Sequence, residues 1–250
     1  MCLILFAYSD NPKRPLVIAA NRDEVHARPT LACAGWADYP AIIAGRDLKA
    51  GGTWLGLNQE DGRFAAVTNF TDPQVPDAPA SRGDLARDYL NGRSSAQDFA
   101  EAIDHPAYRG FNLLLWDSQH LIYTSNRGDM RVLKPGIYGL ANALLGAQWP
   151  KVLRGTRNLG ALLEGEPCID SILDLLNDQH QPPDHQLPER GNDIEMERRV
   201  APCFLVGEEY GTRASTALIH LGDRVLMSEQ QYAPGGVTGA RTDFSITLGK

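Results

Sequence analysis

Residues 16–24 read LVIAANRDE, and this stretch indicates how the chain begins to fold. Five apolar residues are followed, without a turn, by four consecutive polar ones at 21–24. A short apolar run bounded by polar residues is typical of a buried strand that ends at a site or in solvent. We therefore predict a strand over residues 16–20, with four polar side chains placed just past its end.

A second apolar run precedes this stretch and is its expected partner. Residues 3–8 read LILFAY, and the Ser-Asp-Asn-Pro sequence at 9–12 is a turn signal between the two runs. In an antiparallel hairpin the start of the first strand lies beside the end of the second. Cys2 is therefore expected to be a neighbour of residues 21–24.

Cys2 is the residue in this arrangement with the most distinctive chemistry. Once Met1 is removed, its α-amine has an ordinary pKa of about 7.7–8.0 and can accept the proton of its own thiol. A carboxylate such as Asp23 would hold and orient that amine. Two plainer interpretations stand beside this one. Cys2 is a buried thiol in an edge strand, as free cysteines commonly are, and residues 21–24 are a solvated strand end with local ion pairs.

Turn signals and periodicity predict the remaining elements. Strands are expected at 53–57, 64–70, 212–220, 224–231 and 244–248, with an antiparallel meander over 112–141 in which Arg127-Gly128-Asp129 is a turn. Helices are expected from Ser81, over 95–103, from Pro150 and over 169–176. Irregular stretches are expected at 28–40, 71–80 and 178–193. This order suits helices packed outside antiparallel sheets, in a single domain spanning 1–250.

Composition narrows the function classes. The chain has 250 residues, of which 43% are hydrophobic and 22% charged, which is typical of a globular domain with a substantial core. Its net charge of −7 disfavours a nucleic-acid or anionic-membrane partner. The apolar start of the chain ends at Ser9, too short for a signal peptide or a membrane span. We therefore expect a cytoplasmic protein with a small-molecule partner.

Cysteine and histidine usage argues against a metal or a cofactor. The four cysteines form no CxxC pair, and the six histidines show no metal-binding spacing. Neither a GxGxxG fingerprint nor a Walker loop is present in the sequence. We therefore expect neither a bound metal nor a cofactor.

Several short motifs point to a known family when they are taken together. They are Met-Cys at the start, Asn-Arg-Asp-Glu at 21–24, Arg28-Pro29, Gly45-Arg46-Asp47, Ala-Gly-Gly-Thr-Trp-Leu-Gly at 50–56, Thr-Asn-Phe at 68–70, Tyr-Gly-Leu-Ala-Asn at 138–142, Trp-Pro-Lys at 149–151 and Tyr-Gly-Thr-Arg at 210–213. Over essentially the whole chain they resemble the NRDE family, the family of the transport-and-Golgi-organisation type 2 proteins. That family resembles the N-terminal nucleophile hydrolases, especially the choloylglycine hydrolase and penicillin V acylase branch. The resemblance implies an α+β fold, a four-layer αββα sandwich of two antiparallel sheets flanked by helices.

The resemblance also implies roles for individual residues. It implies the nucleophile at Cys2, a contact to the N-terminal amine at Asp23, oxyanion donors at Asn69 and Asn142, and a late arginine at Arg213. Contacts to a substrate are expected from Asn21, Arg22, Glu24 and Trp54. One departure stands out, because the hydrolases place an arginine just before their Asn-x-Asp element. This chain has Ala20 there and carries its arginine in the middle slot, at Arg22.

Two functions follow from these features. The first is an N-terminal cysteine nucleophile hydrolase or acyltransferase acting on an amide, ester or thioester of a small molecule, with Arg22 or Arg213 lowering the thiol pKa or binding an anionic substrate. The second, implied by eukaryotic members of the NRDE family, is a non-catalytic carrier of haem, or of a lipid or acyl-coenzyme A. Cys203 follows a proline and does not precede one, so it does not form a Cys-Pro haem motif.

Overall fold

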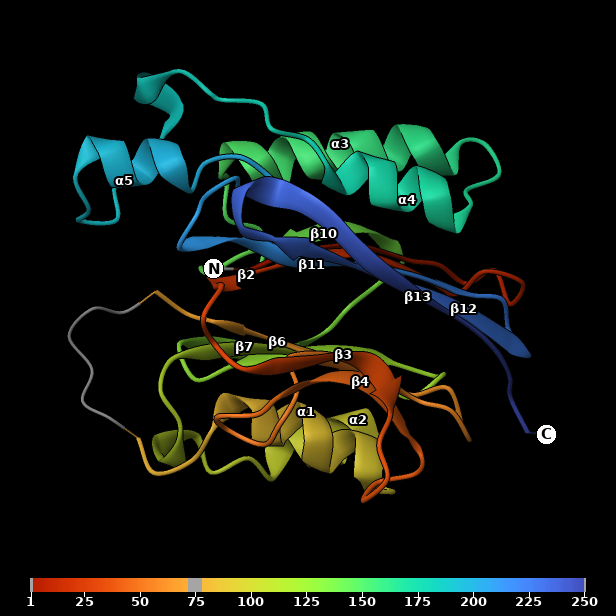
Figure 1. Cartoon of the computed structure of the whole chain (residues 1–250). Helices are drawn as coiled ribbons and strands as arrows, with labels where there is room; N and C mark the ends of the chain where they lie inside the picture. The colour runs from red at the N-terminus through yellow and green to blue at the C-terminus, as the bar shows by residue number, and fades with distance from the viewer. Residues whose placement is uncertain (1, 72–77, 250) are drawn as a thin grey trace.

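Two antiparallel sheets lie face to face in the computed structural model, which describes residues 2–71 and 78–249 (Figure 1). The first sheet has the order β10-β1-β2-β11-β12-β13, and the second has the order β3-β4-β5-β6-β7-β8-β9. The strands of the first sheet are β1 (Cys2–Tyr8), β2 (Leu16–Val25), β10 (Gly136–Leu140), β11 (Tyr210–His220), β12 (Arg224–Ala233) and β13 (Val237–Thr247). The strands of the second are β3 (Thr30–Gly35), β4 (Ile42–Asp47), β5 (Leu55–Asn58), β6 (Phe64–Asn69), β7 (Phe111–Trp116), β8 (Leu121–Ser125) and β9 (Gly128–Val132).

Helices cover the outer face of each sheet. The helices are α1 (Arg82–Asn91), α2 (Ala96–Glu101), α3 (Pro150–Leu163), α4 (Ile169–Leu176) and α5 (Ile194–Arg199), with 3₁₀ turns at His105–Ala107, Asp184–Gln186 and Pro234–Gly236. Figure 1 shows α3 and α4 over the first sheet, and α1 and α2 under the second. The four-layer αββα sandwich expected from the family resemblance is therefore confirmed.

The helix starts were readable because their capping chemistry is local. The Ser81 hydroxyl accepts a hydrogen bond from the Gly83 N–H and caps α1, and the Ser95 hydroxyl does the same for α2. Pro150 occupies the first turn of α3, where its missing N–H costs no hydrogen bond. None of the helices in the described part of the chain is long and apolar enough to cross a membrane.

Alternate side chains of the hairpin formed by β1 and β2 contribute to two different hydrophobic cores. Ile4, Phe6 and Ile18 face the second sheet and join the core between the sheets. Leu5 and Ala19 face the other way and pack beneath α3 and α4. Side chains that are one residue apart on β1 or β2 therefore enter different layers, since strand side chains alternate between faces.

The hairpin was predicted correctly, but the position of its polar residues was not. Residues 21–24 lie inside β2 rather than past its end, because β2 pairs with β1 as far as Arg22 and with β11 as far as Val25. Cys2 pairs with Arg22 across the hairpin, and Gly211 of β11 pairs with Glu24. The four polar side chains therefore alternate between the two layers instead of clustering.

Other boundaries also differ from expectation. The stretch 28–40 is not irregular throughout, since it contains β3, which pairs with β4 around a bulge. The last strand, β13, is longer than expected, and α5, which directly follows the expected irregular stretch at 178–193, was not predicted. The expected Arg-Gly-Asp turn is displaced, because Gly128 already begins β9. The expected loop at 71–80 lies largely outside the described residues.

Candidate active site

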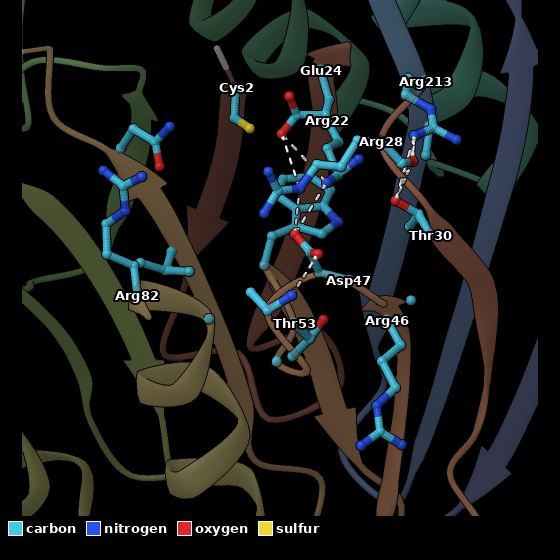
Figure 2. A pocket seen from close by; sticks show the side chains of 18 of the residues that line it. Cys2, Arg22, Glu24, Arg28, Thr30, Arg46, Asp47, Thr53, Arg82 and Arg213 are labelled. Carbon is cyan, nitrogen blue, oxygen red and sulfur yellow. Dashed lines mark hydrogen bonds and ion pairs between the residues drawn. The ribbon is translucent and has the colours of Figure 1, made fainter. Parts of the chain in front are cut away.

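A cavity of about 390 Å³ opens between the two sheets, at the end where β1 begins and β2 ends. Both sheets contribute to its walls, together with the loop at 50–53 and the first residues of α1. Figure 2 shows Cys2 at this cavity, with a group of charged side chains beside it. The cavity is where the apolar core between the sheets gives way to polar residues.

Strand alternation places the thiol of Cys2 in this cavity. Cys2 lies on the same face of β1 as Ile4 and Phe6, which belong to the core between the sheets. Its side chain therefore extends that row of residues into the cavity, where it is partly exposed. Burial raises the pKa of the Cys2 thiol, while the neighbouring Arg22 guanidinium acts in the opposite direction.

Asn142 positions the backbone nitrogen of Cys2. The Cys2 nitrogen donates to Asn142 Oδ1 at 3.2 Å, and Asn142 Nδ2 donates to the backbone carbonyl of Asn69 at 2.9 Å. The loop that carries Asn142 is itself held, because the Thr68 hydroxyl donates to the Ala141 carbonyl at 2.9 Å. In this arrangement Asn142 fixes residue 2, and a donor role toward an oxyanion would require its bond to Asn69 to break. The side chain of Asn69 is exposed, and Asn69 lines the cavity.

Asp23 lies beside Cys2, on the helix side of β2. Its carboxylate is buried and accepts a hydrogen bond of 2.7 Å from the Thr212 hydroxyl. Burial raises the pKa of Asp23, whereas the amino-terminal charge and the buried Lys151 favour its ionised form. Lys151 donates from Nζ to the Val200 carbonyl at 2.9 Å. Sequence reasoning noticed the Trp-Pro-Lys motif but assigned no role to this lysine.

Asn21, from which a contact to a substrate is expected, is not among the residues that line the cavity. It is fully buried, and its Nδ2 donates to the carbonyls of Leu176 and Cys203 at 2.9 Å each. Its Oδ1 accepts from the Ser215 hydroxyl at 2.6 Å. Asn21 therefore joins β2 to the elements behind it, a role that its position in a polar motif did not reveal.

Two arginines in the cavity are paired with carboxylates. Arg28 contacts Asp47 at 2.6 Å and Glu24 at 3.8 Å, and Arg22 lies 3.6 Å from Glu24 and 3.9 Å from Asp47. Figure 2 shows these four side chains as one group near the centre of the site. Burial acts to raise the pKa of Asp47, but hydrogen bonds from Arg28 and backbone N–H groups outweigh it and lower that pKa. Arg22 and Glu24 reach the cavity as expected, whereas the motifs containing Arg28 and Asp47 had been given no role.

Two further arginines, Arg82 and Arg213, bond only to uncharged oxygens. Arg82 Nη1 donates to the Gly110 carbonyl at 3.1 Å, and Arg213 Nη1 donates to the Arg28 carbonyl at 2.5 Å. Among the described residues, no carboxylate lies within ion-pair distance of either guanidinium. Arg213 is the residue at a bulge in β11, between Thr212 and Ala214, and bulges commonly redirect a side chain near a site. The described part of the cavity therefore contains guanidinium charge that no described carboxylate pairs with.

The glycine pair in the 50–56 motif has a steric explanation. A Cβ on Gly52 would lie 2.4 Å from the backbone carbon of Gly83, so the loop and the start of α1 touch backbone to backbone. The Thr53 N–H also donates to the Gly83 carbonyl at 3.2 Å. The next residue, Trp54, lines the cavity.

Glu229 is a buried carboxyl in the wall that sequence reasoning missed. It comes from β12 of the first sheet and accepts the backbone N–H of Cys33, in β3 of the second, at 2.6 Å. Gln231 Nε2 donates to the same oxygen at 2.6 Å. Burial raises the pKa of Glu229. This carboxyl joins the two sheets at the cavity, and no sequence motif marks it.

The described residues of the site do not form a metal centre. Within residues 2–71 and 78–249, no group of three or more His, Cys, Asp and Glu side chains could hold a metal ion. The polar groups at the cavity are instead a thiol, amides, carboxyls and guanidinium groups. These are the groups that acyl transfer and the binding of acidic ligands use.

The fold has a counterpart among solved enzymes. An N-acylethanolamine-hydrolysing acid amidase orthologue from Caenorhabditis elegans superposes with a TM-score of 0.56, covering 88% of this chain and 93% of that chain at 9% sequence identity. At this identity the likeness concerns the fold alone. With the αββα layers described above, it defines a protein of the N-terminal nucleophile hydrolase-like fold class.

Sequence comparison identifies the family within this class. The family model for transport and Golgi organisation 2 matches residues 1–234. The human transport and Golgi organization protein 2 homolog is 32% identical, with 88% of each chain covered. The Drosophila melanogaster protein is 29% identical over 88% of this chain and 87% of its own. The chain belongs to the transport and Golgi organisation 2 family, which confirms the family resemblance drawn from the motifs.

Proposed function

We propose that this protein is an N-terminal cysteine nucleophile enzyme, a hydrolase or acyltransferase that acts on an amide, ester or thioester of a small molecule. One observation carries the proposal. The thiol of Cys2 enters a cavity between the sheets while its own nitrogen is held by Asn142, next to the buried carboxylate of Asp23. Removal of Met1 would turn that nitrogen into a free amine at the same place.

The reaction proceeds in two balanced stages. The amine of Cys2 takes the thiol proton, and the sulfur forms a bond to the substrate carbonyl carbon while the carbonyl π electrons move to oxygen. The tetrahedral intermediate collapses, the bond to the leaving group breaks, and the leaving group receives the proton from the amine. Water, or an acceptor alcohol or amine, then attacks the thioester by the same route, which releases the acyl product and restores the thiol.

The cavity suits a small substrate that carries negative charge. A volume of about 390 Å³ is at the lower end of the range for small-molecule sites. Arg82 and Arg213 lack carboxylate partners among the described residues, and a guanidinium binds carboxylates and phosphates well. Trp54 adds an aromatic surface for an apolar part of the ligand.

The same guanidinium groups also favour a second function. A carrier of haem, or of a lipid or acyl-coenzyme A, would present acidic groups to Arg82 and Arg213 without undergoing any reaction. The two functions differ in what they require of the amino terminus. An enzyme needs a free Cys2 amine, whereas a carrier tolerates a retained Met1.

Covalent acylation of Cys2 tests the enzyme directly. We expect the protein with a free Cys2 to gain one acyl group from a p-nitrophenyl ester, as measured by intact-protein mass spectrometry. The exposed Cys168 should first be replaced by serine, because hydrogen bonds with Ser171 lower the pKa of its thiol and make it a competing nucleophile.

The Cys2→Ala variant, in the same Cys168→Ser background, should gain no acyl group and release no excess p-nitrophenol. A retained Met1 in protein from its natural source, or equal acylation of Cys2→Ala, would refute the enzymatic function. Titration with haem and with acyl-coenzyme A, followed by absorbance and calorimetry, would then test the carrier.

A further inference from the structure

The proposed reaction also requires a group that stabilises an oxyanion. Acyl transfer places negative charge on the former carbonyl oxygen, and preformed donors that face this oxygen supply a large part of the rate enhancement. The amide nitrogen of Asn142 is already bonded to the Asn69 carbonyl. A donor other than Asn142 must therefore come from the cavity wall, where both the side chain of Asn69 and that of Arg82 lie.

Arg82 occupies a suitable position. It is the first residue of α1, directly after the Ser81 cap, and the start of this helix lines the cavity. Arg82 and Cys2 both line the cavity, and Figure 2 shows them apart from each other, with Cys2 at the start of β1. A substrate carbonyl attacked by Cys2 would lie in this cavity.

The guanidinium is anchored and yet retains free donors. One N–H of Arg82 bonds to the Gly110 carbonyl, which fixes the direction of the side chain. A guanidinium has five N–H groups, and the other four have no hydrogen-bond partner among the described residues. Its position is thus set by one bond, and the rest of the group faces the cavity.

The electrostatic surroundings also favour an anion at Arg82. Burial lowers the pKa of Arg82, and the positive charges of Arg109 and Arg28 act in the same direction, whereas the negative charges of Cys2 and Glu24 act in the opposite direction. Negative charge at this position would relieve that repulsion. Arg22 differs, because Glu24 and Asp47 already lie close to its guanidinium.

We propose that Arg82 is a catalytic residue that donates hydrogen bonds from its guanidinium to the oxyanion formed when Cys2 attacks a carbonyl. This inference rests on the proposed acyl-transfer function and assigns the oxyanion site to α1 and the second sheet. The electron pair displaced from the carbonyl π bond lies on the oxygen bound by Arg82. It returns to re-form the carbonyl when the leaving group departs.

Two electrophiles that react with the Cys2 thiol distinguish stabilisation of the oxyanion from stabilisation of the thiolate. p-Nitrophenyl acetate is a neutral ester whose reaction with Cys2 forms an oxyanion, whereas iodoacetamide alkylates the thiolate by direct displacement and forms none. In a Cys168→Ser background we expect Arg82→Gln to slow acylation of Cys2 by roughly 10²–10³-fold, the usual effect of losing one oxyanion donor. The rate at which iodoacetamide alkylates Cys2 in the same variant should change by less than about twofold. Displacement at sulfur forms no oxyanion, so the loss of an oxyanion donor leaves it largely unaffected.

Two further variants serve as controls. Arg82→Lys keeps the charge with a different donor geometry and should lie between wild type and Arg82→Gln in acylation rate. Arg87→Gln removes another arginine from α1, one that pairs with Asp84 and Asp88, and should leave both rates unchanged. Circular dichroism melts of all variants establish that the comparison is between folded proteins.

The possible outcomes are distinct. Equal loss of acylation and alkylation in Arg82→Gln would overturn the proposal, because it would show that Arg82 stabilises the thiolate. Unchanged acylation in Arg82→Gln would overturn it as well, while leaving Cys2 as the nucleophile. Failure of the unsubstituted chain to acylate at Cys2 would instead refute the proposed function itself.

Discussion

The two ends of the space between the sheets are built from the same strands and differ in almost every other respect. At one end of β2 the residues that face this space are Leu16 and Ile18, and at the other they are Arg22 and Glu24. The first end is filled by Trp116, whose ring packs against Tyr8 and His220. The second end holds the cavity with Cys2. In this fold the site lies where an apolar row along continuous strands becomes polar.

Replacing one tryptophan at each end should give the largest difference in the free energy of unfolding between the filled end and the cavity end. Trp116 is almost completely buried at the filled end, whereas Trp54 is partly exposed at the cavity. We expect Trp116→Ala to lower the free energy of unfolding by about 3–5 kcal/mol, because a large void would remain in a packed core. Trp54→Ala should cost clearly less, because its side chain is not fully enclosed. Urea denaturation of both variants measures the difference.

His220 allows the burial of the filled end to be tested by the pH dependence of stability. Burial at the filled end lowers its pKa from 6.5 to about 4, and its Nδ1 accepts the Gly222 N–H at 3.1 Å, so the neutral ring is favoured. The folded state then binds fewer protons than the unfolded state between these values. The contribution of His220 to the free energy of unfolding is therefore fully present above about pH 6.5. It falls by about 3 kcal/mol as the pH is lowered toward 4.

The measurement is the difference in unfolding free energy between pH 7 and pH 4. The His220→Gln variant cannot titrate at this position and should lose less stability over the same range. Identical pH dependence in the two proteins would show that the filled end does not exclude the imidazolium ion.

The smallest expected change in the free energy of unfolding comes from α1, the helix that begins at the cavity. Ser81→Ala removes the cap of α1 and should cost about 1 kcal/mol of unfolding free energy, the usual value for such a cap. Because Arg82 follows directly, this variant should also slow acylation of Cys2. Ser95→Ala removes the equivalent cap of α2, away from the cavity, and should cost a similar free energy without affecting Cys2. Equal acylation rates in the two variants would contradict a link between the α1 cap and the site.

The parts of the fold that could be predicted depend on local signals. The hairpin of β1 and β2 follows from two apolar runs and a turn, and the starts of α1 and α3 follow from Ser81 and Pro150. The bounds of β2 could not be predicted, because its polar half is held in the sheet by pairing with β11, almost 190 residues away in sequence. Tertiary pairing overrides local polarity there.

At the site, too, the positions of residues close together in the sequence could be predicted, and those of residues from distant elements could not. Cys2 and Asp23 could be proposed as neighbours because a hairpin fixes their spacing. Lys151, Glu229 and Arg82 could not be placed, because each reaches the site from an element whose position only the packed layers determine. Asn21 lies in a different layer from Arg22 for a related reason, because a one-residue step along a strand changes the layer that a side chain enters.

The contact between Gly52 and Gly83 has a mechanical consequence. Two backbones that touch with no side chain between them, and that share a hydrogen bond from Thr53, cannot slide past each other without a clash. The loop and the start of α1 therefore behave as one rigid body. Trp54 and Arg82 lie on either side of this junction, so their spacing stays constant, and any adjustment of the cavity to its contents has to come from the opposite wall.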